Sequence, residues 1–114
     1  MTDDNPNVYD IQLEDFEARV LEASHQRPVL VDFWADWCPP CIALAPILQT
    51  VILEQDGAIA LAKLEVDEGE NMKLAGRYQV RGFPTVILFR NGEEQARFTG
   101  AQTRSSIEIF IDSH

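Results

Sequence analysis

Two cysteines, Cys38 and Cys41, lie in the segment Trp37-Cys38-Pro39-Pro40-Cys41 and are the only cysteines among the 114 residues. Thiols at this spacing can close a small disulfide ring and open it again by thiol–disulfide exchange. The attacking species is the thiolate, which unpaired backbone amides and the helix dipole stabilise at the first turn of a helix. The pattern therefore predicts a reversible dithiol in which Cys38 attacks and Cys41, one turn inside the helix, resolves the mixed disulfide.

An acidic residue, Asp32, lies in the middle of the most apolar run of the chain, six positions before Cys38. Burial of an unpaired carboxylate is unfavourable and raises its pKa, so that the group can accept and return a proton near neutral pH. We expect Asp32 to deprotonate Cys41 during resolution and Lys63, inside a second apolar run, to tune that carboxylate. The alternatives are an aspartate that is hydrogen-bonded in the core or lies at a strand edge, and a lysine whose amine reaches solvent.

Metal binding is the main chemical alternative for the two thiols. A structural zinc site takes four ligands, usually four cysteines or two cysteines and two histidines. The chain offers two thiols and two histidines, His25 and His114, which lie far from the cysteines in the sequence. We therefore predict no metal site and no cofactor, and we assign both histidines to the surface.

Composition and charge limit the possible partners. The chain is 46% hydrophobic and 25% charged, and its nine basic and nineteen acidic residues give a net charge of −10. This charge opposes binding to nucleic acid and to anionic membranes. The first residues lack the basic start and apolar core of a signal peptide, and no run approaches the roughly 20 apolar residues of a membrane span. We expect a cytoplasmic protein, where a Cys-x-x-Cys pair is more typical of redox chemistry or metal binding than of a structural disulfide.

Helices and strands are predicted to alternate along the chain. Apolar residues at helical spacing predict helices, and unbroken or alternating apolar runs predict strands. The expected helices cover residues 13–24, a helix that starts at the cysteine motif and continues to residue 56 with Gly57 as the C-cap, residues 69–77, and a last helix capped by Thr103. The expected strands cover 29–35, 58–66, 85–90 and 95–99. Residues 1–8 are expected to be loosely ordered.

These elements predict an α/β fold with a central mixed β-sheet flanked by helices on both faces. The strand, helix and strand within residues 29–66 form a β-α-β unit with parallel strands, and Asn91-Gly92 favours an antiparallel hairpin after it. No linker, repeat or low-complexity segment divides the chain, so we expect one domain over residues 1–114. The cysteines then follow a central strand at its carboxyl end, where open α/β sheets bind their ligands.

Several segments together resemble the thioredoxin family, in order and in spacing, over nearly the whole chain. They are Val31–Cys41, Ala45-Pro46, Lys63, Val80–Thr85, Phe89–Gly92 and Gly100-Ala101. The combination is highly specific, whereas a Cys-x-x-Cys pair alone is a weak signal. The resemblance implies the thioredoxin fold and a protein disulfide oxidoreductase that passes through a mixed disulfide.

The resemblance also implies roles for particular residues in this chain. Cys38 would be an exposed nucleophile and Cys41 the resolving thiol. Asp32 would be a buried proton carrier, and a cis peptide bond would precede Pro84 beside the disulfide.

Partner proteins with disulfides or reactive thiols are the implied substrates. They would dock on Trp37, on the backbone of Gly82-Phe83-Pro84, and on Gly100-Ala101. An extended substrate segment can pair with exposed backbone next to the nucleophile. A reductase such as thioredoxin reductase, or a glutathione system, would restore the dithiol. As an isolated domain the chain is expected to be a monomer.

Two positions in the motif depart from the common family pattern. Pro39 stands where glycine is usual, and Ile42 stands where a basic residue is usual. Pro39 has no amide to offer a thiolate, and Pro40 makes the helical region unfavourable for it, so we expect a stiffer loop. Ile42 removes a cation near the sulfurs and extends an apolar docking patch. We therefore include Pro39, Pro40 and Ile42 in the expected substrate-binding surface.

A second family resemblance keeps an alternative open. Residues 98–103 and the acidic start of the chain are similar to thioredoxin domains that open bacterial co-chaperones with C-terminal tetratricopeptide-like helices. On this alternative the apolar patch at Ile42 would hold unfolding client proteins, and disulfide exchange would be secondary.

Overall fold

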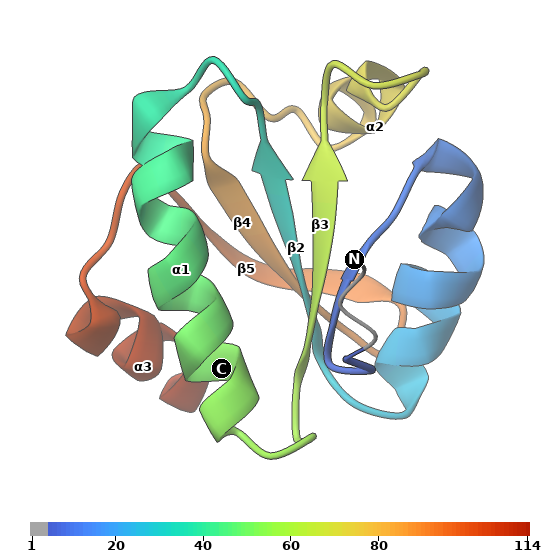
Figure 1. Cartoon of the computed structure of the whole chain (residues 1–114). Helices are drawn as coiled ribbons and strands as arrows, with labels where there is room; N and C mark the ends of the chain where they lie inside the picture. Colours follow the sequence, from blue (N-terminus) through green and yellow to red (C-terminus); the bar gives the residue numbers. More distant parts are fainter. Residues whose placement is uncertain (1–4) are drawn as a thin grey trace.

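The computed structural model of the chain describes residues 5–114, which form one mixed β-sheet with helices on both faces. The strand order across the sheet is β1-β3-β2-β4-β5, so that β2 lies at the centre (Figure 1). Strands β1 and β2 run parallel to β3, whereas β4 is antiparallel to both β2 and β5. The strands are β1 Val8–Asp10, β2 Val29–Trp34, β3 Ala60–Glu65, β4 Thr85–Arg90 and β5 Glu93–Thr99. The predicted fold class is confirmed.

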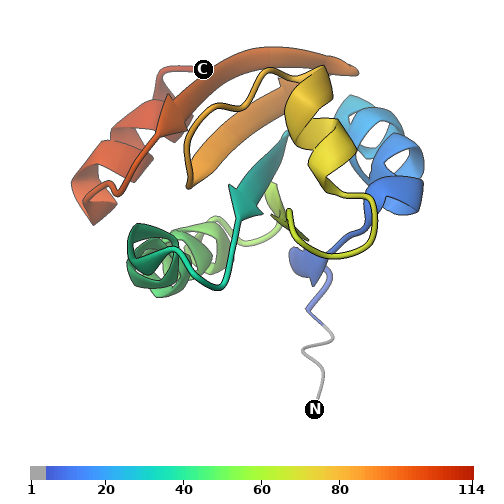
Figure 2. The same cartoon turned by 90° about the horizontal axis from the view of Figure 1, so that it is seen from above.

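Two layers of helix cover the sheet (Figures 1 and 2). Helices α1, Pro39–Glu54, and α3, Arg104–Asp112, pack on one face and contact each other. Helix α2, Met72–Arg77, and the helical segment 13–25 lie on the other face. This arrangement follows from the β-α-β connection, because a crossover helix must pack back onto the sheet.

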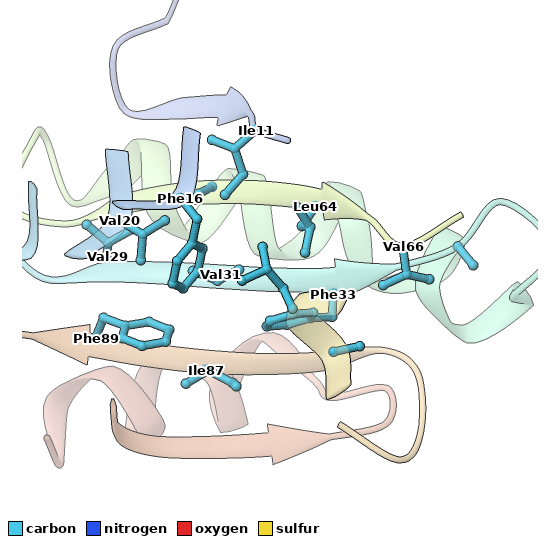
Figure 3. Close-up of a cluster of buried hydrophobic side chains, with 14 of the residues drawn as sticks. Ile11, Phe16, Val20, Val29, Val31, Phe33, Leu64, Val66, Ile87 and Phe89 are labelled. Atoms are coloured by element: carbon cyan, nitrogen blue, oxygen red, sulfur yellow. The ribbon is translucent and has the colours of Figure 1, made fainter. Parts of the chain in front are cut away.

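Successive side chains of β2 point to opposite faces of the sheet, and they separate the core into two clusters. Val29, Val31 and Phe33 belong to the cluster under segment 13–25 and α2, which Figure 3 shows with Phe16 and Phe89. Leu30 belongs to the cluster under α1 and α3. Both faces of β2 are therefore buried, as its unbroken apolar sequence predicts.

The N-terminal part of the chain differs from the sequence expectation. The expectation of a loosely ordered segment 1–8 is wrong for Val8, which is buried and starts β1; residues 1–4 lie outside the described residues. The Leu61 amide donates to the Asn7 carbonyl at 2.7 Å and the Ile11 amide to the Lys63 carbonyl at 2.9 Å. Because β1 has only three residues and depends on pairing with β3, its sequence carries no periodic signal of its own.

The expected first helix is present but irregular. Its turns are 3₁₀ at Leu13–Asp15, π at Glu17–Glu22 and 3₁₀ at Ala23–His25, rather than one regular α-helix. Its apolar positions nevertheless reach the core through Phe16 and Val20. Apolar spacing therefore located the buried face correctly but did not determine the hydrogen-bond pattern of the backbone.

The ends of α1, of the β4–β5 hairpin and of α3 can be compared with the ends predicted from local sequence. Helix α1 begins at Pro39, so Cys38 and Cys41 flank its first turn as predicted, but its C-cap is Gln55 rather than Gly57. Asn91 and Gly92 have φ of 55° and 81°, which is the geometry that a two-residue hairpin requires, so the hairpin prediction is confirmed. Thr103 also caps α3 as predicted, because its side chain accepts a hydrogen bond from the Ser106 amide at 3.1 Å.

Candidate active site

The two cysteines lie where the chain leaves the central strand and enters α1. Strand β2 ends at Trp34, and Cys38 is the N-cap of α1 with extended backbone, φ −108° and ψ 99°. Cys38 and Cys41 form a disulfide bond with their Cα atoms 5.3 Å apart. The first turn of the helix thus holds the two sulfurs together, which is the geometry of a reversible dithiol.

One backbone amide within the described chain donates to the Cys38 sulfur. It belongs to Cys41, whose N–H lies 3.3 Å from Cys38 Sγ. Helix N-caps usually accept from the second or third residue of the helix, and the first two residues here are prolines without an N–H. Pro39 and Pro40 therefore remove two amides that would otherwise be free at this end of the helix.

The exposure of the cysteines corrects one expectation. Cys38 is 4% exposed and Cys41 is 1% exposed, so in this disulfide form neither is an exposed nucleophile in the ordinary sense. The side chains on either side, Trp37, Pro39 and Pro40, are exposed. The sulfurs therefore lie just below a surface formed by an indole ring and two proline rings.

Asp32 is buried, as predicted. The residue is 2% exposed, and its Oδ1 atom has no hydrogen-bond partner among the described residues. Burial raises the pKa of Asp32 from 3.8 to about 7, and the charge of Lys63 partly opposes that rise. A carboxyl group with this pKa exchanges protons readily at neutral pH.

Lys63 lies beside Asp32 on the adjacent strand but does not form its ion pair. The two residues are register partners in β2 and β3, whereas the Lys63 amine lies 3.8 Å from Asp10 Oδ1. The amine is partly exposed, so the alternative of a lysine that reaches solvent describes its position. Its charge nevertheless acts on the buried carboxyl group across the strand pair.

A cavity of about 170 Å³ connects Asp32 with the outer side of α1. Its lining consists of Asp32, Trp34, Ile42, Ala45 and Lys63. Trp34 Nε1, like Asp32 Oδ1, is buried and has no hydrogen-bond partner within residues 5–114. Sequence reasoning missed Trp34 and Ala45, although the period of two in β2 places Trp34 on the same face as Asp32.

The loop before β4 and the end of β5 come together next to the disulfide. The Phe83-Pro84 peptide bond is cis, in agreement with the resemblance, and the Gly100 amide donates to the Pro84 carbonyl at 2.8 Å. Phe83 packs against the core cluster that contains both cysteines. The structure therefore brings this loop and Gly100 to the same region as the motif, and Ala101 follows there as an exposed residue.

Trp37 is held over this region from two sides. Its ring lies 6.0 Å from the Phe83 ring in an edge-to-face arrangement at 88°. Its indole nitrogen donates a hydrogen bond to Asp67 Oδ2, from an acidic segment to which the sequence assigned no role. Both contacts join residues far apart in the sequence, so they could not be predicted from the motif.

The comparisons with known proteins agree with this geometry. A family model described as Thioredoxin matches residues 7–113. The chain belongs to the thioredoxin family. It is 42% identical over 101 residues to "Thioredoxin C-2" of Corynebacterium nephridii, with 89% of this chain and 90% of the relative covered. It is 41% identical over 99 residues to "Thioredoxin" of Pseudomonas aeruginosa, with 87% and 88% covered.

A plant relative extends the comparison. The chain is 37% identical over 107 residues to "Thioredoxin M-type, chloroplastic" of Spinacia oleracea. The aligned region covers 94% of this chain and 57% of the relative. Thioredoxins are disulfide oxidoreductases, and the Cys38–Cys41 pair gives this chain the same chemistry. The protein is therefore a thiol–disulfide oxidoreductase whose partners are protein substrates and a reductase.

Two further findings concern other kinds of site and location. Within residues 5–114, no group of three or more histidine, cysteine or acidic side chains is arranged to hold a metal ion. In the same described part of the chain, none of the helices combines the length and apolar character that crossing a bilayer requires.

Proposed function

We propose that the protein reduces disulfides of other proteins, with separate roles for its two thiols. The Cys38 thiolate attacks one sulfur of the substrate disulfide, and the other substrate sulfur leaves as a thiolate. The Cys41 thiolate then attacks Cys38 Sγ, which closes the Cys38–Cys41 disulfide and releases the second substrate thiolate. Two electrons pass from the dithiol to the substrate. The disulfide at the N-terminus of α1, with the Cys41 amide directed at Cys38 Sγ, carries this proposal.

Asp32 is the proposed proton acceptor for Cys41. Its buried carboxylate with a pKa of about 7 can take the thiol proton through water in the adjoining cavity and release it to solvent. Lys63 is the proposed positioning residue, since its charge limits the rise in the pKa of Asp32. Pro84 is the proposed boundary of the site opposite the cysteines.

The substrate is proposed to dock as an extended segment across the surface around the disulfide. Exposed apolar side chains provide contact area on one side, and backbone groups of the two loops can pair with the segment on the other. The proposed contacts are Trp37, Pro39, Pro40, Ile42, Gly82, Phe83, Gly100 and Ala101.

The remaining assignments are also proposals. Thioredoxin reductase or a glutathione system is the proposed electron donor, and the cytoplasm is the proposed location because its thiol buffers favour a reduced Cys-x-x-Cys pair. We further propose a single domain over residues 1–114 that acts as a monomer without a cofactor. The co-chaperone alternative receives no support from the relatives named above, which are thioredoxins.

Differential alkylation tests which thiol attacks. The protein is fully reduced, treated with a limiting amount of iodoacetamide at pH 7, and digested so that mass spectrometry measures modification at each cysteine. We expect Cys38 to react at least ten times faster than Cys41, because only Cys38 is the helix N-cap. Equal rates, or faster reaction at Cys41, would contradict the proposed division of roles.

The double proline gives a second testable effect, on the reduction potential. Pro40→Ala restores an amide at the second helical residue, where it can donate to the Cys38 thiolate. A hydrogen bond to a charged group contributes about 1.5–3 kcal/mol, so the reduced form gains stability and the potential should rise by roughly 30–60 mV. Equilibration with glutathione buffers measures the shift.

Pro39→Ala is the matched control for this experiment. It removes the same ring at the first helical residue, whose amide does not point at the N-cap side chain. We expect a smaller shift than for Pro40→Ala. An equal or larger shift in Pro39→Ala would show that loop stiffness, rather than amide donation, determines the potential.

A further inference from the structure

The outward face of helix α1 is unusual for a surface helix. Of its sixteen residues only the last, Glu54, is charged, whereas 25% of the whole chain is charged. The inner side packs in the core through Leu44, Leu48 and Ile52. A helix that is apolar on all sides is normally covered on all sides, yet Figure 2 shows the side of α1 away from the sheet without a neighbouring element.

Three exposed apolar residues on this side, Ile42, Pro46 and Leu53, follow one line along the helix, and the half-buried polar Gln49 lies on the same line between Pro46 and Leu53. The four residues are separated by four, three and four positions, and we call this line the α1 seam. Ile42 is 51% exposed and Leu53 is 45% exposed. Alternating steps of four and three are the spacing by which one helix packs along another. From Ile42 to Leu53 the seam spans roughly 16 Å, or three helical turns, at 1.5 Å per residue.

Two hollows lie beside the seam. The Asp32 cavity opens beside Ile42 and Ala45. A second hollow of about 310 Å³ is lined by Pro46, Ile47 and Thr50 of α1 and by Arg104 of α3. Side chains of a packed helix fit into such spaces between ridges, so the shape of this face matches a helical partner better than a flat sheet.

Acidic residues at the ends of the seam indicate the charge of the partner. The exposed Asp36 precedes α1, and Glu54 ends it. Arg104 bonds both Glu54 and Glu108, so one guanidinium meets two carboxylates there. With a net charge of −10, a second copy of this chain would be repelled, whereas a helix with basic residues beside its apolar stripe would be attracted.

We propose that the α1 seam is a docking site for an amphipathic α-helix of a different protein, with an apolar stripe of about three turns and basic flanks. The seam is continuous with the proposed docking surface, because Ile42 lies one residue after Cys41. A partner on the seam would therefore be held beside the disulfide. This proposal does not depend on the exchange mechanism, since it concerns non-covalent contact with the oxidised protein.

A cysteine-free peptide tests the proposal on the oxidised full chain. The probe is a fluorescein-labelled 14-residue helix with leucines at alternating steps of four and three and lysines on both flanks of this leucine stripe. Its control has the same composition in an order that breaks the stripe. We expect the striped probe to bind at least ten times more tightly by fluorescence anisotropy and to shift the NMR amide signals of α1 between residues 42 and 53.

Substitutions on and off the α1 seam test whether the striped probe binds there. Leu53→Lys and, separately, Gln49→Lys should each weaken binding of the striped probe at least tenfold. Ile109→Lys on α3 is the control, since Ile109 is 65% exposed and lies off the seam, and it should leave binding within a factor of two. Equal binding of the two probes, an effect of Ile109→Lys as large as that of Leu53→Lys, or a homodimer joined along α1 in analytical ultracentrifugation would overturn the proposal.

Discussion

A Cys41→Ser variant is expected to lose all turnover and to accumulate as a covalent complex with its protein substrates. With serine at 41, the mixed disulfide on Cys38 has no neighbouring thiol to resolve it. Cys38→Ser should lose turnover as well but form no such complex. Cys41 is only 1% exposed, so its sulfur is not accessible to a protein disulfide. Non-reducing electrophoresis of each variant with a disulfide-containing protein such as insulin measures the complex.

The double variant Cys38→Ser/Cys41→Ser is the control for non-covalent association, which reducing agent does not release. Complexes of Cys41→Ser should disappear completely when dithiothreitol is added. If Cys38→Ser forms as much covalent complex as Cys41→Ser, then the proposed roles of the two thiols are wrong. The outcome does not depend on the α1 seam, because both single variants keep that surface intact.

The parts of the site that the sequence predicts are those that depend on short segments. The N-cap position of Cys38 follows from a strand, a short loop and a helix that begins with prolines, and all of these lie within a dozen residues. The burial of Asp32 follows from the apolar run around it. In both cases neighbouring residues already contain the physical cause.

The parts that the sequence does not predict depend on contacts between distant segments. The indole of Trp37 meets Asp67 thirty positions away, and Lys63 pairs with Asp10 from a strand that had not been expected. The cavity beside Asp32 exists only because α1 crosses β2 and β3 at that level. Composition and periodicity describe each element by itself, so they cannot give the spaces between elements.

The structure shows physical effects of the two departures from the family pattern, Pro39 and Ile42. Pro39 and Pro40 leave the Cys41 amide as the one backbone donor to Cys38 Sγ in the described chain. Ile42 does two things at once, because it lines the cavity that leads to Asp32 and begins the α1 seam. An isoleucine in place of the usual basic residue therefore changes both the lining of the cavity beside Asp32 and the surface beside the disulfide.

Replacement of the buried carboxyl group is expected to stabilise the protein at neutral and alkaline pH. Burial raises the pKa of Asp32 from 3.8 in the unfolded chain to about 7 in the folded protein. Between these values the folded state holds a proton that the unfolded state has lost, so the free energy of unfolding falls as pH rises, by up to about 1.4 kcal/mol per pH unit. Above pH 7 the total loss is about 4 kcal/mol.

Asp32→Asn removes this titration and keeps the shape of the side chain. Urea unfolding of the oxidised protein should show that the free energy of unfolding rises by a few kcal/mol at pH 8. At pH 4 it should rise by less than about 1 kcal/mol, because that pH lies close to the pKa of 3.8 in the unfolded chain and little of the linked loss has yet developed. Asp36→Asn, at an exposed carboxylate, is the control and should change stability by less than about 0.5 kcal/mol. An equal gain at both pH values would mean that packing, and not the buried charge, sets the effect. In stopped-flow measurement of both steps, the same variant should slow resolution by Cys41 more than attack by Cys38, because the proposed mechanism uses Asp32 as the proton acceptor only during resolution.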